Sequence, residues 1–478
     1  MRSDVIIIGS GFGGSFAAHR LVNAGAKVTM IERGPWRKTA PLERLGVQVE
    51  RSPLPRGRHV FSHLVREVHA PFLKASGVRL NRHGLFDIHL GGELTVVCSS
   101  GVGGGSHVYS AMNTRPIDPA YWTGHVDGVD EHVMSPWYDE ALKVMGSQVP
   151  QPGQGMPNFT GDRLATDPLL KADADLAQPA MGYRFESGHY RNNSFLGSAQ
   201  GDKVTLDERL IVPATSKGLT VLDRHEALDI GAAASGWRVT VRDEAGRYRH
   251  LQAPRLIMAA GTLNTLRLML GSRARGQLGE LPGLGLGIGG NGDSPAWWAC
   301  QHEDADYSLG PPCHGRFTLR EGDTPGYLTS LGLNGVDELP LPASIKKRLK
   351  QGLLLVGMGT DGANGQAVWR KGRLQLRYDR EANPILGDIA KAYRQLGLAS
   401  GRPLYQFPQW PATVHPLGGA RLSQSARTGV VNGQGQVHGL PGLYVADASA
   451  LPAAPGTPPS MTIAAWGQHV AQGICLEG

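Results

Sequence analysis

The chain begins with a pattern that narrows how its N-terminal part can fold. An apolar, β-branched run from Asp4 to Ile8 predicts one buried parallel strand, and Gly9, Gly11 and Gly14 follow it with the spacing GxGxxG. The first glycine permits a tight turn, the second lets a pyrophosphate approach the backbone, and the third lets the next helix pack closely on the strand. The pattern therefore predicts a strand, a turn and a helix whose N-terminal amides face the phosphates of a dinucleotide.

A second strand and an acidic residue extend the same pattern. Residues 27–31 predict the strand, and Glu32 follows it about 20 residues after the glycines, where a carboxylate can hydrogen-bond the ribose hydroxyls. A glycine-rich turn without a ligand is the alternative, but it would not require the strand, the helix and the acid as well. We therefore expect a bound dinucleotide, although these residues alone do not say which one.

Composition sets broad limits on fold and partners. With 478 residues the chain exceeds a single comfortable core, so two domains are expected. The net charge is +7, but no dense Lys/Arg tract with interleaved aromatic residues is present, so we expect a mildly basic surface and no nucleic-acid partner. Residues 341–350 predict a short basic amphipathic helix, for which a solvated face is favoured over a membrane-surface or partner contact.

Cysteine usage and hydropathy bear on location. Cys98, Cys300, Cys313 and Cys475 are far apart and form no CxxC pair, so neither a metal site nor a disulfide framework is expected. No signal peptide precedes the first strand, and no apolar run is long enough to cross a membrane. The chain is therefore expected to be cytoplasmic.

Strand-like segments recur at distant positions, which predicts a domain built from discontinuous pieces. Residues 219–222 and 224–230 read as a strand pair that continues through 237–241. Residues 255–262 predict a strand and a glycine turn followed by a helix over 263–270, and 442–447 predict a strand that ends at Asp447. Pro458 and Pro459 then lead into a helix over 460–471, since proline is well tolerated in a first helical turn.

A second glycine cluster supplies the link to a known family. The run Gly101-Val-Gly103-Gly104-Gly105-Ser106 would cost folding entropy in a plain solvent loop, so its backbone is expected to approach a ligand. Together with the N-terminal fingerprint, residues 259–265 and the sequence His415-Pro-Leu-Gly-Gly419, it resembles the glucose–methanol–choline (GMC) oxidoreductases, in their cholesterol-oxidase-like branch.

The resemblance implies a fold and a cofactor. The fold class would be α/β, with a Rossmann-like FAD-binding domain of the GMC and p-hydroxybenzoate-hydroxylase type, formed by residues 1–115, 196–285 and 411–478. A mainly antiparallel β substrate domain with helices would comprise residues 116–195 and 286–410. The cofactor would be FAD, with no metal. The implied cofactor-binding residues are Gly9, Gly11, Phe12, Gly14, Glu32, Arg33, Gly101, Gly103, Gly104, Gly105, Ser106, Met112, Ala227, Ala260, Gly261, Asp447, Ala448, Pro459, Ser460 and Met461.

The resemblance also assigns the catalytic base and exposes a departure. His415 occupies the place of the family histidine, and an imidazole titrates in the range needed to take a proton from an alcohol. The family's second polar residue, a His or Asn, is replaced by Pro458, which has no side-chain donor or acceptor. Residues 326–331 offer no counterpart to the glutamate base of cholesterol oxidases, and Glu303, Asp304 and Asp306 cannot be placed at the site from sequence.

Four functional hypotheses follow. The leading one is oxidation of an alcohol carbon of a hydrophobic, sterol- or terpenoid-like molecule by hydride transfer to flavin N5, with His415 as general base. The alternative, motivated by Pro458, is a flavin-bound enzyme of specialised metabolism that catalyses isomerisation, desaturation, lyase or ring-forming chemistry. A flavin-bearing binding protein and an NAD-dependent dehydrogenase are less favoured, the latter because three further motifs would be unexplained. The sequence leaves the oligomeric state and the electron acceptor open.

Overall fold

The computed structural model describes residues 3–47, 50–91, 93–150, 179–187, 193–299, 306–319, 324–406 and 412–476. Cys300, Glu303 and Asp304, which entered the sequence analysis, lie outside these ranges.

A five-stranded parallel sheet forms the centre of the molecule. Its strands, in spatial order, are β11 (Leu219–Leu222), β2 (Val28–Ile31), β1 (Val5–Ile8), β15 (Arg255–Met258) and β25 (Leu443–Val445). All four residues of β1 are buried, as expected for a strand covered on both faces. The predicted strands near the N-terminus, at 255–262 and at 442–447 are therefore confirmed, and segments distant in sequence do meet in one sheet.

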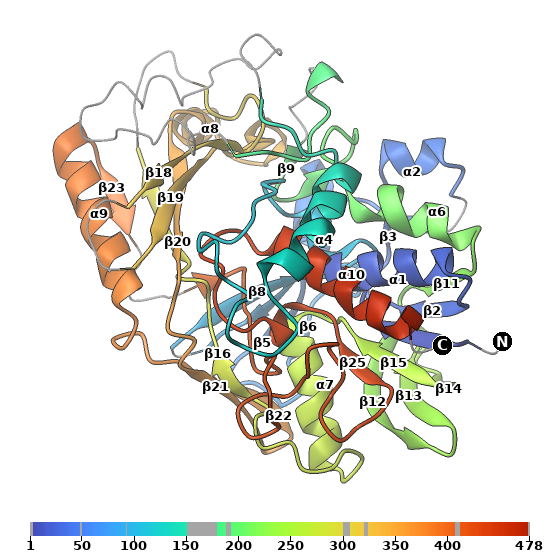
Figure 1. Cartoon of the computed structure of the whole chain (residues 1–478). Coiled ribbons are helices and arrows are strands. Elements are labelled where there is room, and N and C mark those ends of the chain that lie inside the picture. The colour runs from blue at the N-terminus through green and yellow to red at the C-terminus, as the bar shows by residue number, and fades with distance from the viewer. Residues whose placement is uncertain are drawn as a thin grey trace.

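Three helices form a layer beside this sheet: α1 (Phe12–Asn23), α10 (Ser460–Leu476) and α4 (Glu131–Val144) (Figure 1). Glycines allow α1 and α10 to approach closely. A Cβ added at Gly467 would lie 2.5 Å from the carbonyl oxygen of Gly13, and one at Gly13 would lie 1.7 Å from that of Ala446. The N-terminal and C-terminal segments of the chain are thus joined through backbone contact.

The predicted pairing of residues 219–222 with 224–230 is wrong. Strand β11 pairs in parallel with β2, Leu219 opposite Val28, and covers the edge of the central sheet. The chain then turns at Arg224, which has a positive φ of 56°, and enters a separate antiparallel sheet. That sheet comprises β12 (Glu226–Ala233), β13 (Gly236–Arg242) and β14 (Tyr248–Ala253). Strand β11 therefore extends the central sheet beside β2, whereas β12 pairs with β13, so the two segments belong to different sheets.

A second five-stranded sheet, antiparallel throughout, lies beside the cavity described below. Its order is β18 (Cys313–Thr318), β19 (Gly326–Leu331), β20 (Leu353–Gly359), β17 (Ser294–Trp298) and β23 (Leu404–Gln406). Helix α9 (Pro384–Ser400) packs on its outer face, at the left of Figure 1. The antiparallel architecture expected for residues 286–410 is therefore present in their described part.

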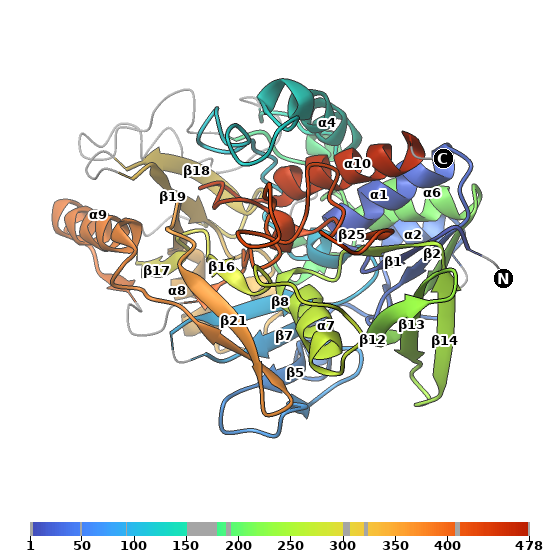
Figure 2. The same ribbon diagram turned by 60° about the horizontal axis from the view of Figure 1, so that its bottom comes forward.

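Two further sheets connect these layers. The mixed sheet has the order β24 (Ala412–Thr413), β8 (Thr95–Ser99), β7 (Phe86–His89), β5 (Val65–His69) and β6 (Val78–Arg79). The smaller one has the order β16 (Leu286–Ile288), β21 (Gly365–Arg370) and β22 (Arg373–Arg377). Helix α7 (Thr262–Ala274), close to β12, contacts β21 and β22 (Figure 2).

Residues 116–150, in the block expected to be mainly antiparallel β with helices, supply one of its helices. This stretch contains α4, whose buried face packs against α10. Met134, Tyr138 and Ala141 join the same hydrophobic core as the central parallel sheet. An apolar side chain every third or fourth residue explains why this segment is a helix.

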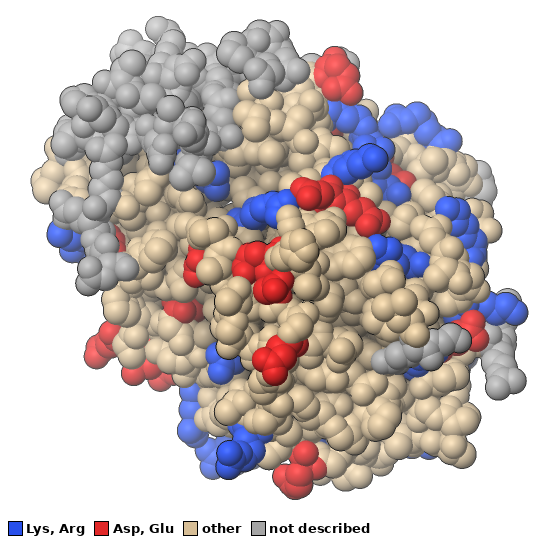
Figure 3. All heavy atoms as spheres, viewed as in Figure 1, with Lys and Arg blue, Asp and Glu red and all other residues tan. Residues whose placement is uncertain are grey.

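The predicted basic helix forms as α8 (Ala343–Lys350), and none of its residues is buried. On the face shown in Figure 3, basic and acidic side chains are interspersed among uncharged ones. In the described ranges, no helix has the length and apolar character needed to cross a membrane. The remaining described α-helices and strands are α2 (Ala40–Arg44), α3 (Val60–His63), α6 (Val212–Thr215), β3 (Trp36–Arg37), β4 (Arg51–Ser52), β9 (Asn193–Ser194) and β10 (Gly197–Ser198).

Candidate active site

A cavity of about 540 Å³ opens where strands of the parallel sheet end, the usual ligand position in open α/β folds. Ile8 and Gly9 line it at the carboxyl end of β1, and Ile31 and Glu32 line it at that of β2. Strands β19 and β20 of the antiparallel sheet and residues 412–416 also line this cavity. One space is therefore bounded by the dinucleotide fingerprint and by the predicted catalytic histidine.

Most of the residues proposed from sequence line this cavity. They are Gly9, Gly11, Phe12, Glu32, Arg33, Gly104, Gly105, Met112, Ala227, Ala260, Gly261, His415, Asp447, Ala448, Pro459 and Ser460. Five proposed residues do not line it: Gly14, Gly101, Gly103, Ser106 and Met461.

The five remaining residues contribute to the layers behind the wall. A Cβ at Gly14 would lie 2.2 Å from the carbonyl oxygen of Gly9, so this glycine permits the close packing of α1 on the turn. The Ser106 hydroxyl donates to the Gly103 carbonyl at 2.7 Å, and the Gly103 amide donates to Ser10 Oγ at 3.1 Å. Met461 is fully buried. These residues hold the glycine-rich loop and α10 in place.

The turn between β1 and α1 has the features of a phosphate cradle. Gly9 has a φ of 105°, and a Cβ there would lie 2.1 Å from the carbonyl oxygen of Ala259. Gly11, the N-cap residue of α1, receives no side-chain cap, and a Cβ added to it would meet no atom within 4 Å. The first amides of α1 therefore face open space beside a bare backbone, which suits a pyrophosphate.

Glu32 lines the cavity but also holds its wall together. Oε2 accepts hydrogen bonds from the Ser10 hydroxyl at 2.7 Å and the Ser10 amide at 3.2 Å. Oε1 accepts from the Gly34 amide at 2.8 Å and the Gly101 amide at 3.4 Å. The carboxylate thus joins the fingerprint turn to the second glycine cluster, a structural role additional to the expected ribose contact.

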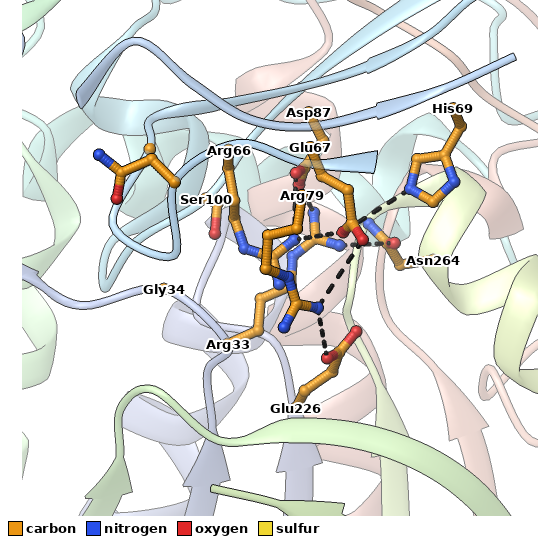
Figure 4. Close-up of polar contacts among 12 residues, drawn as sticks. Arg33, Gly34, Arg66, Glu67, His69, Arg79, Asp87, Ser100, Glu226 and Asn264 are labelled. Carbon is orange, nitrogen blue, oxygen red and sulfur yellow. Dashed lines mark hydrogen bonds and ion pairs between the residues drawn. The ribbon is translucent and has the colours of Figure 1, made fainter. Parts of the chain in front are cut away.

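A buried ion-pair network fixes Arg33 beside the cavity (Figure 4). Its guanidinium pairs with the fully buried carboxylate of Asp87 and donates to the Asn264 side-chain oxygen at 2.9 Å. Arg66 also pairs with Asp87, at 3.1 Å. Burial alone would raise the pKa of Asp87, but the two arginines hold it below its ordinary value. Removing one member of such a buried network leaves an uncompensated charge, so Arg33 is held firmly.

Glu226, at the start of β12, is a second charged residue that lines the cavity and is held by ion pairs. It pairs with Arg242 at 2.7 Å, Arg79 at 3.2 Å and Arg267 at 3.3 Å. Burial opposes ionisation, yet the surrounding arginines hold the pKa of Glu226 far below its usual range. The carboxylate is ionised at neutral pH, and it anchors the strand that presents Ala227 to the cavity.

Asp447, after β25, is buried inside the cavity wall. Its carboxylate accepts from the Gly261 amide and the Ser449 amide, both at 2.9 Å, and from the hydroxyls of Thr265 and Ser449 at 2.5 Å. Burial raises its pKa above the ordinary aspartate value despite these bonds. Asp447 therefore ties β25 to the start of α7 at the sheet edge that faces the cavity.

His415 is paired with a carboxylate that the sequence analysis did not identify. Its Nδ1 lies 2.9 Å from Asp293, whose side chain is only 3% exposed, whereas the imidazole is 20% exposed. Asp293 also accepts from the Thr413 hydroxyl at 2.8 Å and the Val414 amide at 3.0 Å. Both His415 and Asp293 line the cavity.

The wall opposite the fingerprint is apolar because of strand alternation. Leu354, Val356 and Met358 of β20 line the cavity, together with Leu331 of β19. The alternate residues Leu353 and Leu355 point to the other face and pack under α9. The cavity therefore places the His415 imidazole, which can accept a proton, in the same space as an apolar wall.

Pro458 also lines the cavity, and its loop is tied to the chain segment that carries Asp293. The Asn291 side chain accepts from the Gly456 amide at 2.9 Å and donates to the Thr457 carbonyl at 3.1 Å. Asn291 is two residues before Asp293. One loop therefore holds both the segment with His415 and the segment with Pro458.

Asp293, Asn291 and Ser10 are the residues that sequence reasoning missed. The signal for the first two was an acid directly after the glycine-rich run 289–292. That run resembles an ordinary turn, because nothing local shows that it meets a histidine 122 positions away. No carboxylate from residues 286–410 was expected near the base, and Asp293 corrects that expectation.

Comparisons with known proteins agree with this geometry. A family model described as GMC oxidoreductase matches residues 3–286, and a second with the same description matches residues 405–467. The chain is 23% identical to a cholesterol oxidase of Acinetobacter baumannii, with 97% of this chain and 92% of that protein aligned. It is 25% identical to a cholesterol oxidase of Mycobacterium tuberculosis, with 98% and 90% aligned.

Solved structures share the fold at lower identity. A structure described as a new fungal aryl-alcohol oxidase has a TM-score of 0.63 and 14% identity, covering 100% of this chain and 99% of that chain. Pyridoxine 4-oxidase from Mesorbium loti has a TM-score of 0.58 and 16% identity, covering 99% of both chains.

Proposed function

This chain belongs to the GMC oxidoreductases, FAD-dependent flavoproteins that act on CH–OH groups, and we propose that it oxidises an alcohol carbon of an apolar, sterol- or terpenoid-like molecule with His415 as general base. The observation that carries this proposal is the position of His415 in a cavity shared by the dinucleotide fingerprint and an apolar wall. Bound FAD would supply the two-electron acceptor for the hydride of the carbinol carbon.

The cavity fits the cofactor on the evidence of its own backbone. Open space above Gly11 leaves room for the pyrophosphate, and the uncapped amides of α1 provide donors for it. Arg33 and Ala227 would bound the adenosine end, and Ser460, at the start of α10, would face the flavin end. The positive end of the α10 dipole favours negative charge there.

His415 supplies the proton chemistry in this proposal. The alcohol O–H proton moves to the imidazole as the carbinol C–H bond breaks and the C=O bond forms. A positioned general base of this kind contributes about 10²- to 10⁴-fold to the rate. The remaining cavity-lining carboxylates in the described ranges are Glu32, Glu226, Asp293 and Asp447, and each is already engaged by protein donors.

The substrate class is proposed from the wall that faces this base. Leu331, Leu354, Val356 and Met358 offer hydrocarbon surface, and no charged side chain projects from β19 or β20 into the cavity. Burying apolar surface against such a wall contributes about 25 cal/mol per Å². A hydrophobic alcohol is therefore favoured over a charged or strongly hydrated one. The names of the cholesterol oxidase relatives support the same direction.

Anaerobic mixing with a panel of alcohols tests the proposal. We expect sterol or terpenoid alcohols to bleach the flavin absorbance, and hydrophilic alcohols such as glucose and choline not to do so. His415→Ala should lose at least 10²-fold in the rate of bleaching while retaining FAD. The matched control is His438→Ala, because His438 lies outside the cavity and bonds the Ser423 carbonyl at 2.9 Å. Bleaching by none of the hydrophobic alcohols would refute the substrate class, and full activity of His415→Ala would refute the base.

One observation supports a second candidate function. Pro458 lines the cavity without a side-chain donor or acceptor, so the site has one polar group fewer than the family pattern. The second candidate is a flavin-bound enzyme that catalyses isomerisation, desaturation, lyase or ring-forming chemistry. Pro458→Asn discriminates between the two: a gain of alcohol oxidation from an inactive starting point favours the second candidate, whereas efficient oxidation by the unaltered chain favours the first.

A further inference from the structure

Among the described residues, the carboxylate that contacts His415 is Asp293, in the loop at 289–293. Asp293 reaches His415 Nδ1 at 2.9 Å from a chain segment distant in sequence, and its side chain is almost fully buried. The loop itself is also anchored by a contact that does not involve the histidine: the Gly290 amide donates to Asp361 at 2.6 Å.

Hydrogen-bond complementarity decides which nitrogen of His415 bears the proton. An ionised carboxylate only accepts, so Nδ1 must be the donor in the contact with Asp293. The other nitrogen, Nε2, has no hydrogen-bond partner among the described residues, and His415 lines the cavity. The neutral imidazole therefore presents an unprotonated Nε2, which is the form a general base requires.

We propose that Asp293 is a positioning residue that holds His415 in the Nδ1–H tautomer and fixes its ring orientation, so that a single histidine serves a site in which Pro458 provides no second polar side chain. This inference rests on the proposed function, in which His415 is the base. Asp293 also stabilises the imidazolium that forms when the alcohol proton is taken, because its negative charge lies 2.9 Å from Nδ1.

The three donors around Asp293 make the effect of Asp293→Asn specific. The Val414 amide must donate, and the Thr413 hydroxyl also donates to this carboxylate. An asparagine oxygen has two lone pairs for these two donors, so the NH₂ group is left facing His415 Nδ1. Nδ1 then becomes the acceptor, and the proton moves to Nε2, where it blocks base catalysis.

Nitrogen NMR of histidine-labelled holoenzyme reads the tautomer directly, and His415→Gln identifies the signals of His415 by their loss. We expect neutral His415 to carry its proton on Nδ1 in the unaltered chain and on Nε2 in Asp293→Asn. With an alcohol that the enzyme oxidises, kcat of Asp293→Asn should fall about 10²-fold or more, with little change in KM.

Asp361→Asn is the matched control, since Asp361 anchors the same loop without touching His415. It should leave the proton of His415 on Nδ1. An Nε2–H tautomer in the unaltered chain, or an Nδ1–H tautomer retained in Asp293→Asn, would overturn the inference. Because the tautomer is measured without turnover, failure of the proposed function appears separately, as an Nδ1–H tautomer in a protein that oxidises no alcohol.

Discussion

Gly11 has φ −73° and ψ −167°, angles that alanine also adopts, and a Cβ built on it meets no atom within 4 Å. Gly11→Ala should therefore not strain the folded chain. Reduced freedom of the unfolded chain should raise the free energy of unfolding of the apoprotein by about 0.4–1 kcal/mol. The same methyl group would occupy the space in which we propose that the pyrophosphate binds. Losing two charge-assisted hydrogen bonds at about 1.5 kcal/mol or more each weakens FAD binding about 10²-fold or more.

Two other glycines provide graded controls for this change. Gly25, in an exposed turn after α1, has a φ of 91° and open space around its added Cβ, so Gly25→Ala should cost only the left-handed conformation, about 1–2 kcal/mol. Gly9 combines a φ of 105° with a Cβ position 2.1 Å from the carbonyl oxygen of Ala259. Gly9→Ala should therefore destabilise the apoprotein by about 2–6 kcal/mol, from backbone strain and overpacking together.

Denaturant unfolding of the apoproteins, followed by tryptophan fluorescence, measures the free energy of unfolding, and titration with FAD measures the affinity for the cofactor. We expect apoprotein stability to decrease from Gly11→Ala to Gly25→Ala to Gly9→Ala. Gly25→Ala should retain the FAD affinity of the unaltered chain. A Gly11→Ala protein that binds FAD as tightly as the unaltered chain would refute the placement of the pyrophosphate over this residue. A loss of more than about 1 kcal/mol in its apoprotein stability would refute the claim that the space above Gly11 is free.

Three further predictions concern groups outside the reacting centre. Burial and the neighbouring His69 lower the pKa of His89 to about 3, so between pH 6.5 and 3 the unfolded chain binds a proton that the folded chain does not. As the pH is lowered through that window, the free energy of unfolding should therefore decrease by up to about 1.4 kcal/mol per pH unit because of this group. His89→Phe should reduce this slope, measured by denaturant unfolding at several pH values. Tyr393→Phe should lower the free energy of unfolding by about 1–3 kcal/mol, because its hydroxyl accepts from the Gly357 amide at 2.7 Å and donates to the Ser294 carbonyl at 2.6 Å; a change below 0.5 kcal/mol would contradict this. Burial raises the pKa of the Cys98 thiol to about 12, so at pH 8 alkylation of this residue, followed by peptide mass spectrometry, should be about 100-fold slower in the folded than in the unfolded chain, and equal rates would show an open thiol.

Local sequence patterns predicted the elements between which we propose that the cofactor binds. The strand, turn and helix at Val5–Asn23 follow from a β-branched run and three glycines, each of which has a local steric reason. The same holds for the helix after Pro459, because proline is tolerated at a helix start, where the N–H that it lacks would be unpaired in any case. The family resemblance, now shown by the matching family models, added FAD and the reaction class.

Local sequence patterns could not predict which distant segments pair or pack together. Residues 219–222 have the composition of a strand, but only the tertiary structure decides that β2, with a free edge, is the partner. Similarly, residues 131–144 carry a helical apolar stripe whose significance depends on packing against α10. Strand pairing depends on which edge remains open after the other elements have packed, and that is a property of the whole fold.

The chain by itself thus determined the cofactor cradle and identified His415, because both depend on residues close together in sequence. Only the tertiary structure decided that Asp293 is the partner of His415 and that one face of β20 supplies the apolar wall. A hydrogen bond between residues 122 positions apart requires that separate loops converge, and such convergence leaves no periodic trace in sequence. Gly9 to Gly14 therefore predict where the dinucleotide binds, whereas folding determines which groups line the cavity beside His415.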